Sequence, residues 1–103
     1  MEPIQLHNLA WAAAQKAAAD FIAQYGEPYY CGFAWVNFSG TTKFARELKK
    51  AGICRKSYDK GMDVWNPGGH NTQSMDIKET AAQAYASVLR QHGIDAYARS
   101  RAD

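Results

Sequence analysis

The ten residues from Tyr29 to Phe38, YYCGFAWVNF, restrict the possible folds more than any other segment of the chain. Successive side chains of a β-strand point to opposite faces, and here both faces are apolar. One face carries Tyr29, Cys31, Phe33 and Trp35, and the other carries Tyr30, Gly32, Ala34, Val36 and Phe38. Two apolar faces are typical of a strand in the centre of a sheet. Because Gly32 and Ala34 are small, we expect a helix to pack on their face.

Six further elements follow from periodicity and from helix-end signals. The apolar spacing predicts a helix that starts between Pro3 and Asn8 and ends near Tyr25, where Gly26 and Pro28 stop it. Asp76 and Glu79 have the spacing of a capping box, which predicts a helix from there to Gly93. The remaining segments are a helix over 42–51 and strands over 53–58, 62–65 and 94–99.

The resulting order is α-β-α-β-β-α-β. Without the first helix it is βαββαβ, the split βαβ pattern of ferredoxin-like folds, in which the first and third strands lie in the centre. We therefore predict an α+β fold, with an N-terminal helix (residues 1–26) followed by a ferredoxin-like βαββαβ unit (residues 29–100) with an antiparallel sheet. An antiparallel α+β sheet with other connectivity is the alternative. The length of 103 residues fits a single domain, 1–103.

The two cysteines, Cys31 and Cys54, fall on strands that this order places two steps apart, roughly 9–10 Å at about 4.8 Å per step. That separation is too large for a disulfide, so we predict two free thiols. The Ala-rich first helix contains Lys16 and Asp20 and lacks a basic region before it, which favours a helix over a signal peptide. Free thiols and the lack of an export signal favour the cytoplasm.

No motif in the sequence identifies a reaction. There is no nucleophile elbow, P-loop or dinucleotide-binding glycine pattern. His7, His70, His92, Cys31 and Cys54 lack the paired spacing of a zinc site, so we expect no metal and no cofactor. We therefore favour a binding protein over an enzyme.

Basic residues are concentrated in one part of the chain. Seven of the twelve lie between positions 43 and 60, where only Glu47 and Asp59 oppose them. A nucleic-acid surface is one interpretation, with phosphate contacts from Lys43, Arg46, Lys49, Lys50, Arg55 and Lys56. The other is a solvated helix face, because the basic residues of this helix fall away from its apolar stripe, Phe44 and Leu48.

Aromatic residues suggest a second candidate site. Tyr58 and Trp65 lie on the predicted hairpin, beside a glycine-rich loop that carries His70, and Arg99 and Arg101 lie on the last strand and the tail. A base or a partner's side chain would stack on the aromatic rings, and the guanidinium groups would bind phosphate or carboxylate. The alternatives are that the first helix or a second subunit buries the aromatic residues, and that the loop is a plain connection.

The runs YCGFAWVNF, QSMDIKE and SRAD resemble small, mostly uncharacterised accessory proteins of tailed bacteriophages, over most of the stretch from Tyr30 to Asp103. The resemblance implies a phage product that works inside an infected bacterial host cell. Proteins of this kind often act by binding, either by blocking a host enzyme or defence complex or by sequestering a signal nucleotide. The resemblance transfers no catalytic residues.

Three functions remain open from the sequence. The leading one is a phage-encoded binding protein that counteracts a host process, above all an antiviral defence, by inhibiting a protein or sequestering a nucleotide. The second is a nucleic-acid-binding module that uses residues 43–60, and the third is a small enzyme with its site at the His70 loop. The expected partners are a host protein or a nucleotide, with no membrane. Surplus apolar surface predicts a homodimer.

Overall fold

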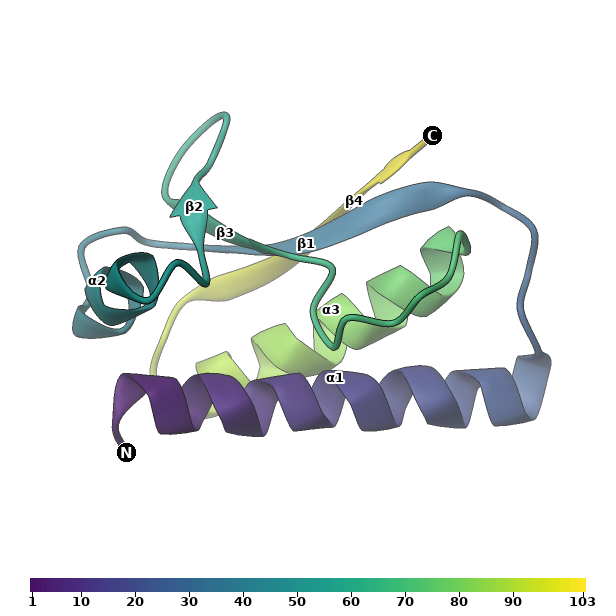
Figure 1. Cartoon of the computed structure of the whole chain (residues 1–103), viewed down its shortest axis with the longest axis horizontal. Coiled ribbons are helices and arrows are strands. Elements are labelled where there is room, and N and C mark those ends of the chain that lie inside the picture. Colours follow the sequence, from purple (N-terminus) through teal and green to yellow (C-terminus); the bar gives the residue numbers. More distant parts are fainter.

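Four antiparallel strands form one open sheet with the order β2-β3-β1-β4 (Figure 1). The computed structural model describes all 103 residues, from Met1 to Asp103. Its elements are α1 (Pro3–Tyr25), β1 (Gly32–Phe38), α2 (Lys43–Lys50), β2 (Arg55–Lys56), β3 (Met62–Trp65), α3 (Met75–Gln91) and β4 (Ala96–Ala102). The predicted α+β class and element order are confirmed. The first and third strands occupy the centre of the sheet, as expected.

The central strand β1 packs against α3 with the face that carries its small residues. Ala34, Val36 and Phe38 are buried on that face. A Cβ atom at Gly32 would lie 2.5 Å from the Met75 sulfur and 2.7 Å from the Arg101 carbonyl oxygen of the neighbouring strand, so a side chain here would force the backbone to shift. The expectation that a helix occupies this face is therefore confirmed. The strand begins later than predicted, and Tyr29 before it is 97% exposed.

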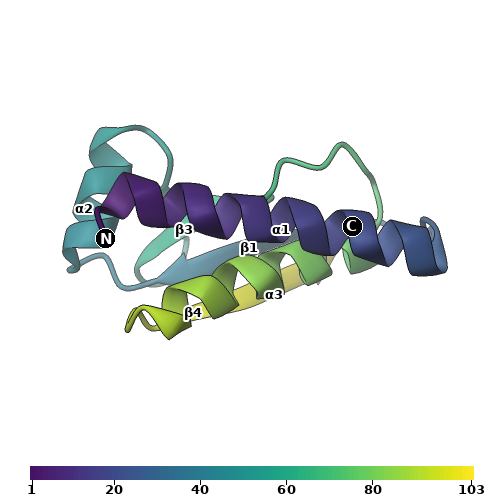
Figure 2. The same cartoon turned by 90° about the horizontal axis from the view of Figure 1, so that it is seen from below.

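Helix α1 packs outside α2 and α3, on the side away from the sheet. It therefore does not cover the face of the sheet that is turned away from the helices. It packs on α3 and α2, and α3 lies between it and β1 and β4 (Figures 1 and 2). Both helices contain small buried alanines, namely Ala10, Ala14 and Ala18 on α1 and Ala81, Ala82 and Ala86 on α3. Small side chains allow close approach of the two backbones. Burial of the strand aromatics beneath the first helix, one of the alternatives, is thus excluded.

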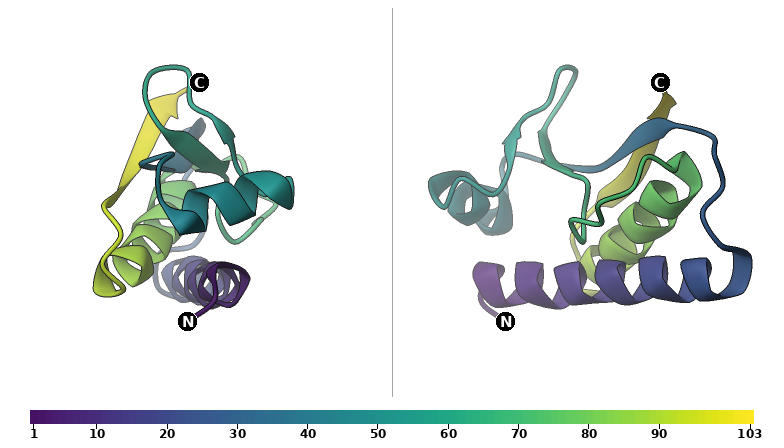
Figure 3. Two further views of the ribbon diagram at one scale, coloured as in Figure 1. Left: turned by 90° about the vertical axis from the view of Figure 1, so that its left-hand side faces the viewer. Right: turned by 45° about the vertical axis from the view of Figure 1, so that its right-hand side comes forward.

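Helix α2 is short and lies at one end of the molecule, near β2 (Figures 1 and 3). Its N-cap is Thr42, whose hydroxyl oxygen accepts a hydrogen bond from the Ala45 amide at 3.0 Å. Phe44 and Leu48 form the predicted apolar stripe and are buried. The Phe44 ring meets Phe38 edge-on, with ring centroids 5.2 Å apart. This contact joins the start of α2 to the end of the central strand.

Several element ends differ from the prediction. Helix α3 begins at Met75 with Ser74 as its N-cap, so Asp76 was wrongly assigned as the cap. The reason is tertiary: the Met75 amide donates to the Tyr30 carbonyl at 2.8 Å, which holds residue 74 extended beside the start of β1. Strand β2 has two residues, and β4 runs later than expected, to Ala102. No helix is long and apolar enough to span a bilayer.

Candidate functional site

The sheet face turned away from the helices, called the open face below, carries cationic and aromatic side chains in register. Across the strands, one row contains Arg55, Asp63, Asn37 and Tyr97, the next contains Trp65, Trp35 and Arg99, and the third contains Phe33 and Arg101. Side chains alternate along each strand, so these nine share one face. The two tryptophans and three arginines therefore lie on adjacent strands.

The indole rings of Trp35 and Trp65 stack across the β1–β3 pair, with centroids 4.6 Å apart and planes inclined by 21°. The guanidinium of Arg55 lies over the Trp65 ring, 5.0 Å from its centroid. Trp65 is thus covered by Trp35 on one side and by Arg55 on the other. Because β3 and β4 flank β1 on opposite sides, the free side of Trp35 is turned toward β4 and Arg99.

The arginines of the open face have no acidic partner. The only two salt bridges in the molecule are Lys16–Asp20 and Lys50–Glu47, both on helices. Arg101 lies 5.9 Å from the Phe33 ring centroid, and Arg99 is Trp35's neighbour in register. Unpaired guanidinium groups beside exposed rings are suited to an anionic, planar ligand, because they donate bidentate hydrogen bonds and also stack.

A buried polar pair lies under the loop that connects β2 to β3. The Asn37 amide nitrogen donates to Asp63 Oδ1 at 2.8 Å and to the Lys60 carbonyl at 2.7 Å. Asn37 and Asp63 are 9% and 4% exposed. Gly61 has a φ of 75°, and a Cβ there would clash with the Phe38 carbonyl oxygen, so this close approach requires glycine. The loop is therefore fixed against the central strand and rises above the open face (Figure 1).

A groove of about 490 Å³, called the aromatic groove below, runs between this loop and β4. Its lining residues are Trp35, Arg55, Lys56, Ser57, Tyr58, Asp59, Asp63, Trp65, Arg99 and Arg101. Four of them are basic and two are acidic, so the groove has an excess of positive charge. The structure thus brings together four of the five residues predicted for the aromatic site: Tyr58, Trp65, Arg99 and Arg101.

His70 is the fifth predicted residue, and it does not line the groove. Asn66, Gly68 and Gly69 all have positive φ angles, which turn the chain toward α1. A Cβ at Gly69 would lie 3.0 Å from the Trp11 ring, so this loop is packed on α1. His70 Nδ1 and Asn66 Oδ1 are buried without a hydrogen-bond partner. His70 therefore lies apart from the other four residues predicted for the aromatic site, and an enzyme with its site at the His70 loop stays a prediction.

The basic segment is divided between two places. Arg55 and Lys56 line the aromatic groove, whereas the cations of α2, namely Lys43, Arg46, Lys49 and Lys50, do not. Two of these four are engaged locally: Arg46 donates to the Thr41 carbonyl at 2.8 Å, and Lys50 pairs with Glu47 at 3.7 Å. The basic residues between positions 43 and 60 therefore do not form one continuous positively charged surface along the groove.

Sequence reasoning missed Trp35 and the Asn37–Asp63 pair. The sequence places Trp35 on the correct face of the central strand, but nothing in the sequence assigns it to the site. The signal that identifies it is alternation: Trp35 and Asn37 share a face of β1, as Asp63 and Trp65 share a face of β3. Their exact pairing depends on register, which the sequence did not determine.

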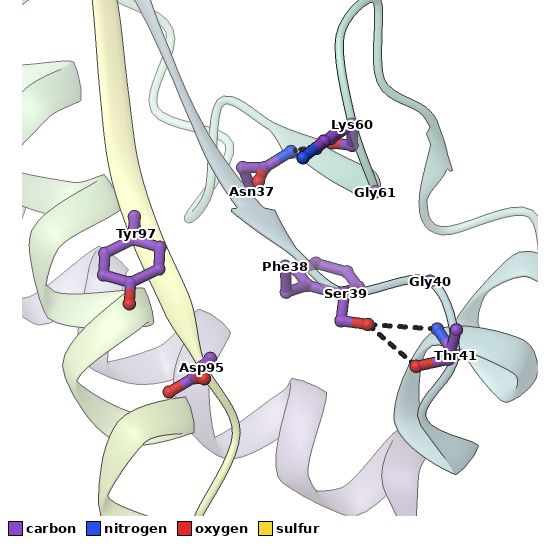
Figure 4. A pocket seen from close by; sticks show the side chains of 9 residues that line it. All are labelled: Asn37, Phe38, Ser39, Gly40, Thr41, Lys60, Gly61, Asp95 and Tyr97. Atoms are coloured by element: carbon purple, nitrogen blue, oxygen red, sulfur yellow. Dashed lines mark hydrogen bonds between the residues drawn. The ribbon is translucent and has the colours of Figure 1, made fainter.

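A second hollow of about 410 Å³ lies where β1 meets α2 (Figure 4). It is lined by Asn37, Phe38, Ser39, Gly40, Thr41, Lys60, Gly61, Asp95 and Tyr97. Ser39 and Thr41 hydrogen-bond to each other there, with 2.9 Å between their hydroxyl oxygens. One lysine faces one aspartate in this lining, so it offers less to an anion than the aromatic groove does.

Three buried groups with perturbed pKa values lie outside both hollows. Burial lowers the pKa of His7 and raises the pKa of both Cys54 and Tyr85. All three belong to the buried interior, and His7 hydrogen-bonds to Tyr85. No three His, Cys, Asp or Glu side chains are grouped as metal ligands. The aromatic groove thus offers stacking and anion binding.

Comparisons of the chain with models of protein families, with curated proteins and with solved structures found no match.

Proposed function

We propose that the protein binds a nucleotide in the aromatic groove. The observation that carries the proposal is the row of Trp65, Trp35 and Arg99 across three strands, with Arg55 and Arg101 beside it and no carboxylate paired to any of these arginines. Stacking on aromatic rings is available to every base, and charge-assisted hydrogen bonds from guanidinium groups suit phosphate.

In this arrangement the base stacks on Trp35. Trp65 is already covered on both sides, by Trp35 and Arg55, so the accessible ring surface is the side of Trp35 that faces β4. Arg99 and Arg101 are two residues apart on the same face of β4, so both reach the same region. They take the phosphate oxygens. Tyr58, which is fully exposed on the opposite wall, is free to contact the base or the sugar.

The size of the groove favours a small ligand over a nucleic-acid duplex. Its volume of about 490 Å³ falls within the usual range of small-molecule sites, roughly 300–1,000 Å³. The groove is walled on one side by the β2–β3 loop. A mononucleotide or dinucleotide fits this description, and so does a short unpaired stretch of a longer strand.

Tryptophan fluorescence during titration with AMP, UMP and the dinucleotide UpU tests the proposal. We expect quenching, because Trp35 and Trp65 lie in the groove. Trp35→Leu should weaken binding by about tenfold or more, since a base–aromatic stack is worth roughly 1–3 kcal/mol. Tripolyphosphate, which has charge but no base, should bind the wild type and Trp35→Leu equally.

The matched arginine variants Arg99→Gln and Arg46→Gln separate the two candidate surfaces. If the groove is the site, Arg99→Gln weakens nucleotide binding and Arg46→Gln leaves it unchanged. The reverse result would move the site to α2, whose exposed Lys43 and Lys49 support the nucleic-acid alternative. A titration with oligo(U) of ten residues in rising salt is the companion measurement, because phosphate contacts make affinity fall steeply with salt.

The biological setting is part of the proposal. We infer that the protein acts in a phage-infected bacterium, where a nucleotide-binding groove would sequester a signal nucleotide and so counteract a host defence. The phage-like runs in the sequence support this setting. Expression of the chain in bacteria that carry a nucleotide-signalled defence, followed by phage challenge, tests it. Protection of the phage by the wild type and not by Arg99→Gln is the expected outcome, and equal activity of both proteins would exclude sequestration in the groove.

We also infer that the sheet with α2 and α3 is a ferredoxin-like unit to which α1 has been added. The central positions of β1 and β3 and the antiparallel pairing throughout support this assignment. The short α2, with eight residues, is the main departure from two long helices on one face. In such a unit the open face is the one free for ligands.

A further inference from the structure

The outer edge of β4 presents unpaired backbone groups. The Asp103 amide donates to the Cys31 carbonyl at 3.1 Å, so the odd-numbered residues of this strand point their backbone groups toward β1. Backbone groups alternate in direction along an antiparallel strand, so those of Ala98, Ser100 and Ala102 point away from the sheet. No hydrogen bond to these three amides is present. The opposite edge of the sheet, β2, has only two residues.

This edge lacks most of the usual protection against pairing with another strand. Natural edge strands carry charged side chains, proline, a bulge, inward-pointing charges or a covering helix, or are kept short. Of these devices β4 has only the charged side chains of Arg99 and Arg101. Strand β4 has seven residues and no proline. The residues whose backbone groups point away from the sheet have small side chains, since they are alanines and Ser100. Only the first outward carbonyl, that of Ala96, is capped, by the Arg90 guanidinium at 2.8 Å.

Charge determines which strand this edge would accept. On the open face, β4 presents Arg99 and Arg101, both without acidic partners. On its other face, Glu79 accepts a hydrogen bond from the Ser100 hydroxyl at 2.6 Å. The most favourable added strand would therefore have acidic side chains on the face with the arginines. It would have uncharged side chains on the face with Glu79. Opposite charges on adjacent strands stabilise the pair, and like charges destabilise it.

We propose that β4 binds an extended segment of a partner protein, in which acidic and uncharged residues alternate, as a fifth strand of the sheet. This mode of recognition uses backbone hydrogen bonds for affinity and alternate side chains for specificity. The proposal is independent of nucleotide binding, although Arg99 and Arg101 face both ligands.

A second copy of the chain is a poorer occupant of the same edge. If residues 98–102 pair antiparallel with the same residues of a second copy, the pairing centres on Ser100. Arg99 of each copy then lies opposite Arg101 of the other. These like-charged pairs oppose the association. The homodimer expected from the sequence stays a prediction, and a dimer formed here would contradict the charge argument.

Amide hydrogen exchange on the ¹⁵N-labelled protein tests the proposal directly. The probe is the peptide acetyl-TETETET-amide, and the control is the same peptide with lysine in place of each glutamate. In the free protein we expect fast exchange at Ala98, Ser100 and Ala102 and slow exchange at Arg99 and Arg101. Saturation with the glutamate peptide should slow the three outward amides by tenfold or more, whereas the lysine peptide should not.

Two variants at one position separate backbone pairing from side-chain contacts. Ser100→Pro removes an outward amide that the sheet does not use, and should weaken peptide binding at least tenfold. Ser100→Ala keeps the amide and should bind as the wild type does. Because Ser100→Pro leaves the arginine side chains in place, it should still bind AMP, so failure of this proposal is distinguishable from failure of the nucleotide site.

Three outcomes would overturn the proposal. They are unchanged exchange at the outward amides under saturating glutamate peptide, equal binding of the lysine peptide, and protection of those amides without peptide together with a doubled mass in light scattering. The last would assign the edge to a second copy. If Ser100→Pro does not fold, the wild-type exchange measurement alone decides.

Discussion

The Nδ1 atom of His7 lies 2.7 Å from the hydroxyl oxygen of Tyr85, and this is the one side-chain hydrogen bond between α1 and α3. Both side chains are buried, and the His7 ring also contacts Trp11, with centroids 5.5 Å apart. Burial lowers the pKa of His7 below its usual 6.5. Burial therefore favours the neutral imidazole at this contact between α1 and α3.

Stability should accordingly fall on acidification. Below about pH 6.5 His7 takes up a proton in the unfolded chain but resists protonation in the folded one. The unfolded state then binds more protons, so the free energy of unfolding decreases as the pH falls and levels off below the folded-state pKa. Urea unfolding at pH 7.5 and pH 5.5 measures the loss. His7→Gln, which cannot titrate, should show a smaller loss; an equal loss would assign the effect to other groups.

Gly32→Ala should destabilise the fold by about 1–3 kcal/mol, the usual range for overpacking. The added methyl would meet the Met75 sulfur at 2.5 Å and the Arg101 carbonyl at 2.7 Å, so the Met75 side chain and the paired backbones of β1 and β4 must shift. Gly40→Ala is the matched control, because its methyl would lie 3.5 Å from the nearest atom, on Met62. Thermal melts of the two variants should differ clearly. Equal melting temperatures would contradict the packing described at Gly32.

The two cysteines should differ in reactivity. Both are free, as predicted, but Cys31 is exposed and Cys54 is buried. Burial raises the pKa of Cys54, and its thiol donates to the Ala45 carbonyl at 3.7 Å, so little thiolate forms. A thiol reagent such as DTNB should therefore label one thiol rapidly in the native protein and the second only on unfolding. Rapid labelling of Cys31→Ser would show that Cys54 is accessible.

The central strand illustrates how far sequence reasoning reaches in this fold. Its two apolar faces correctly predict a position inside the sheet. They also suggest burial of both faces, yet only the face with Ala34 and Val36 is covered. The periodicity of α1 shows that it has an apolar stripe but not which surface that stripe will meet. Its alanines match the alanines of α3, and this complementarity between elements far apart in sequence cannot be inferred from either helix alone.

The candidate site has the same limit. Tyr58, Trp65, Arg99 and Arg101 could be grouped from the sequence because the first two lie on a predicted hairpin and the other two on the last strand and the tail. His70 was grouped with them because it follows Trp65 closely in the chain. The positive φ angles of Asn66, Gly68 and Gly69 separate the two in space. Such turns depend on backbone angles, which residue type restricts but does not specify.

The bond from Asn37 to the Lys60 carbonyl has a consequence for how a ligand would enter. It ties the wall of the aromatic groove to the middle of the sheet, so that the wall is held in place before any ligand arrives. A preformed groove that lies open above the sheet needs no gating step. We therefore expect the observed association rate to rise linearly with ligand concentration, without the plateau that an opening lid would impose.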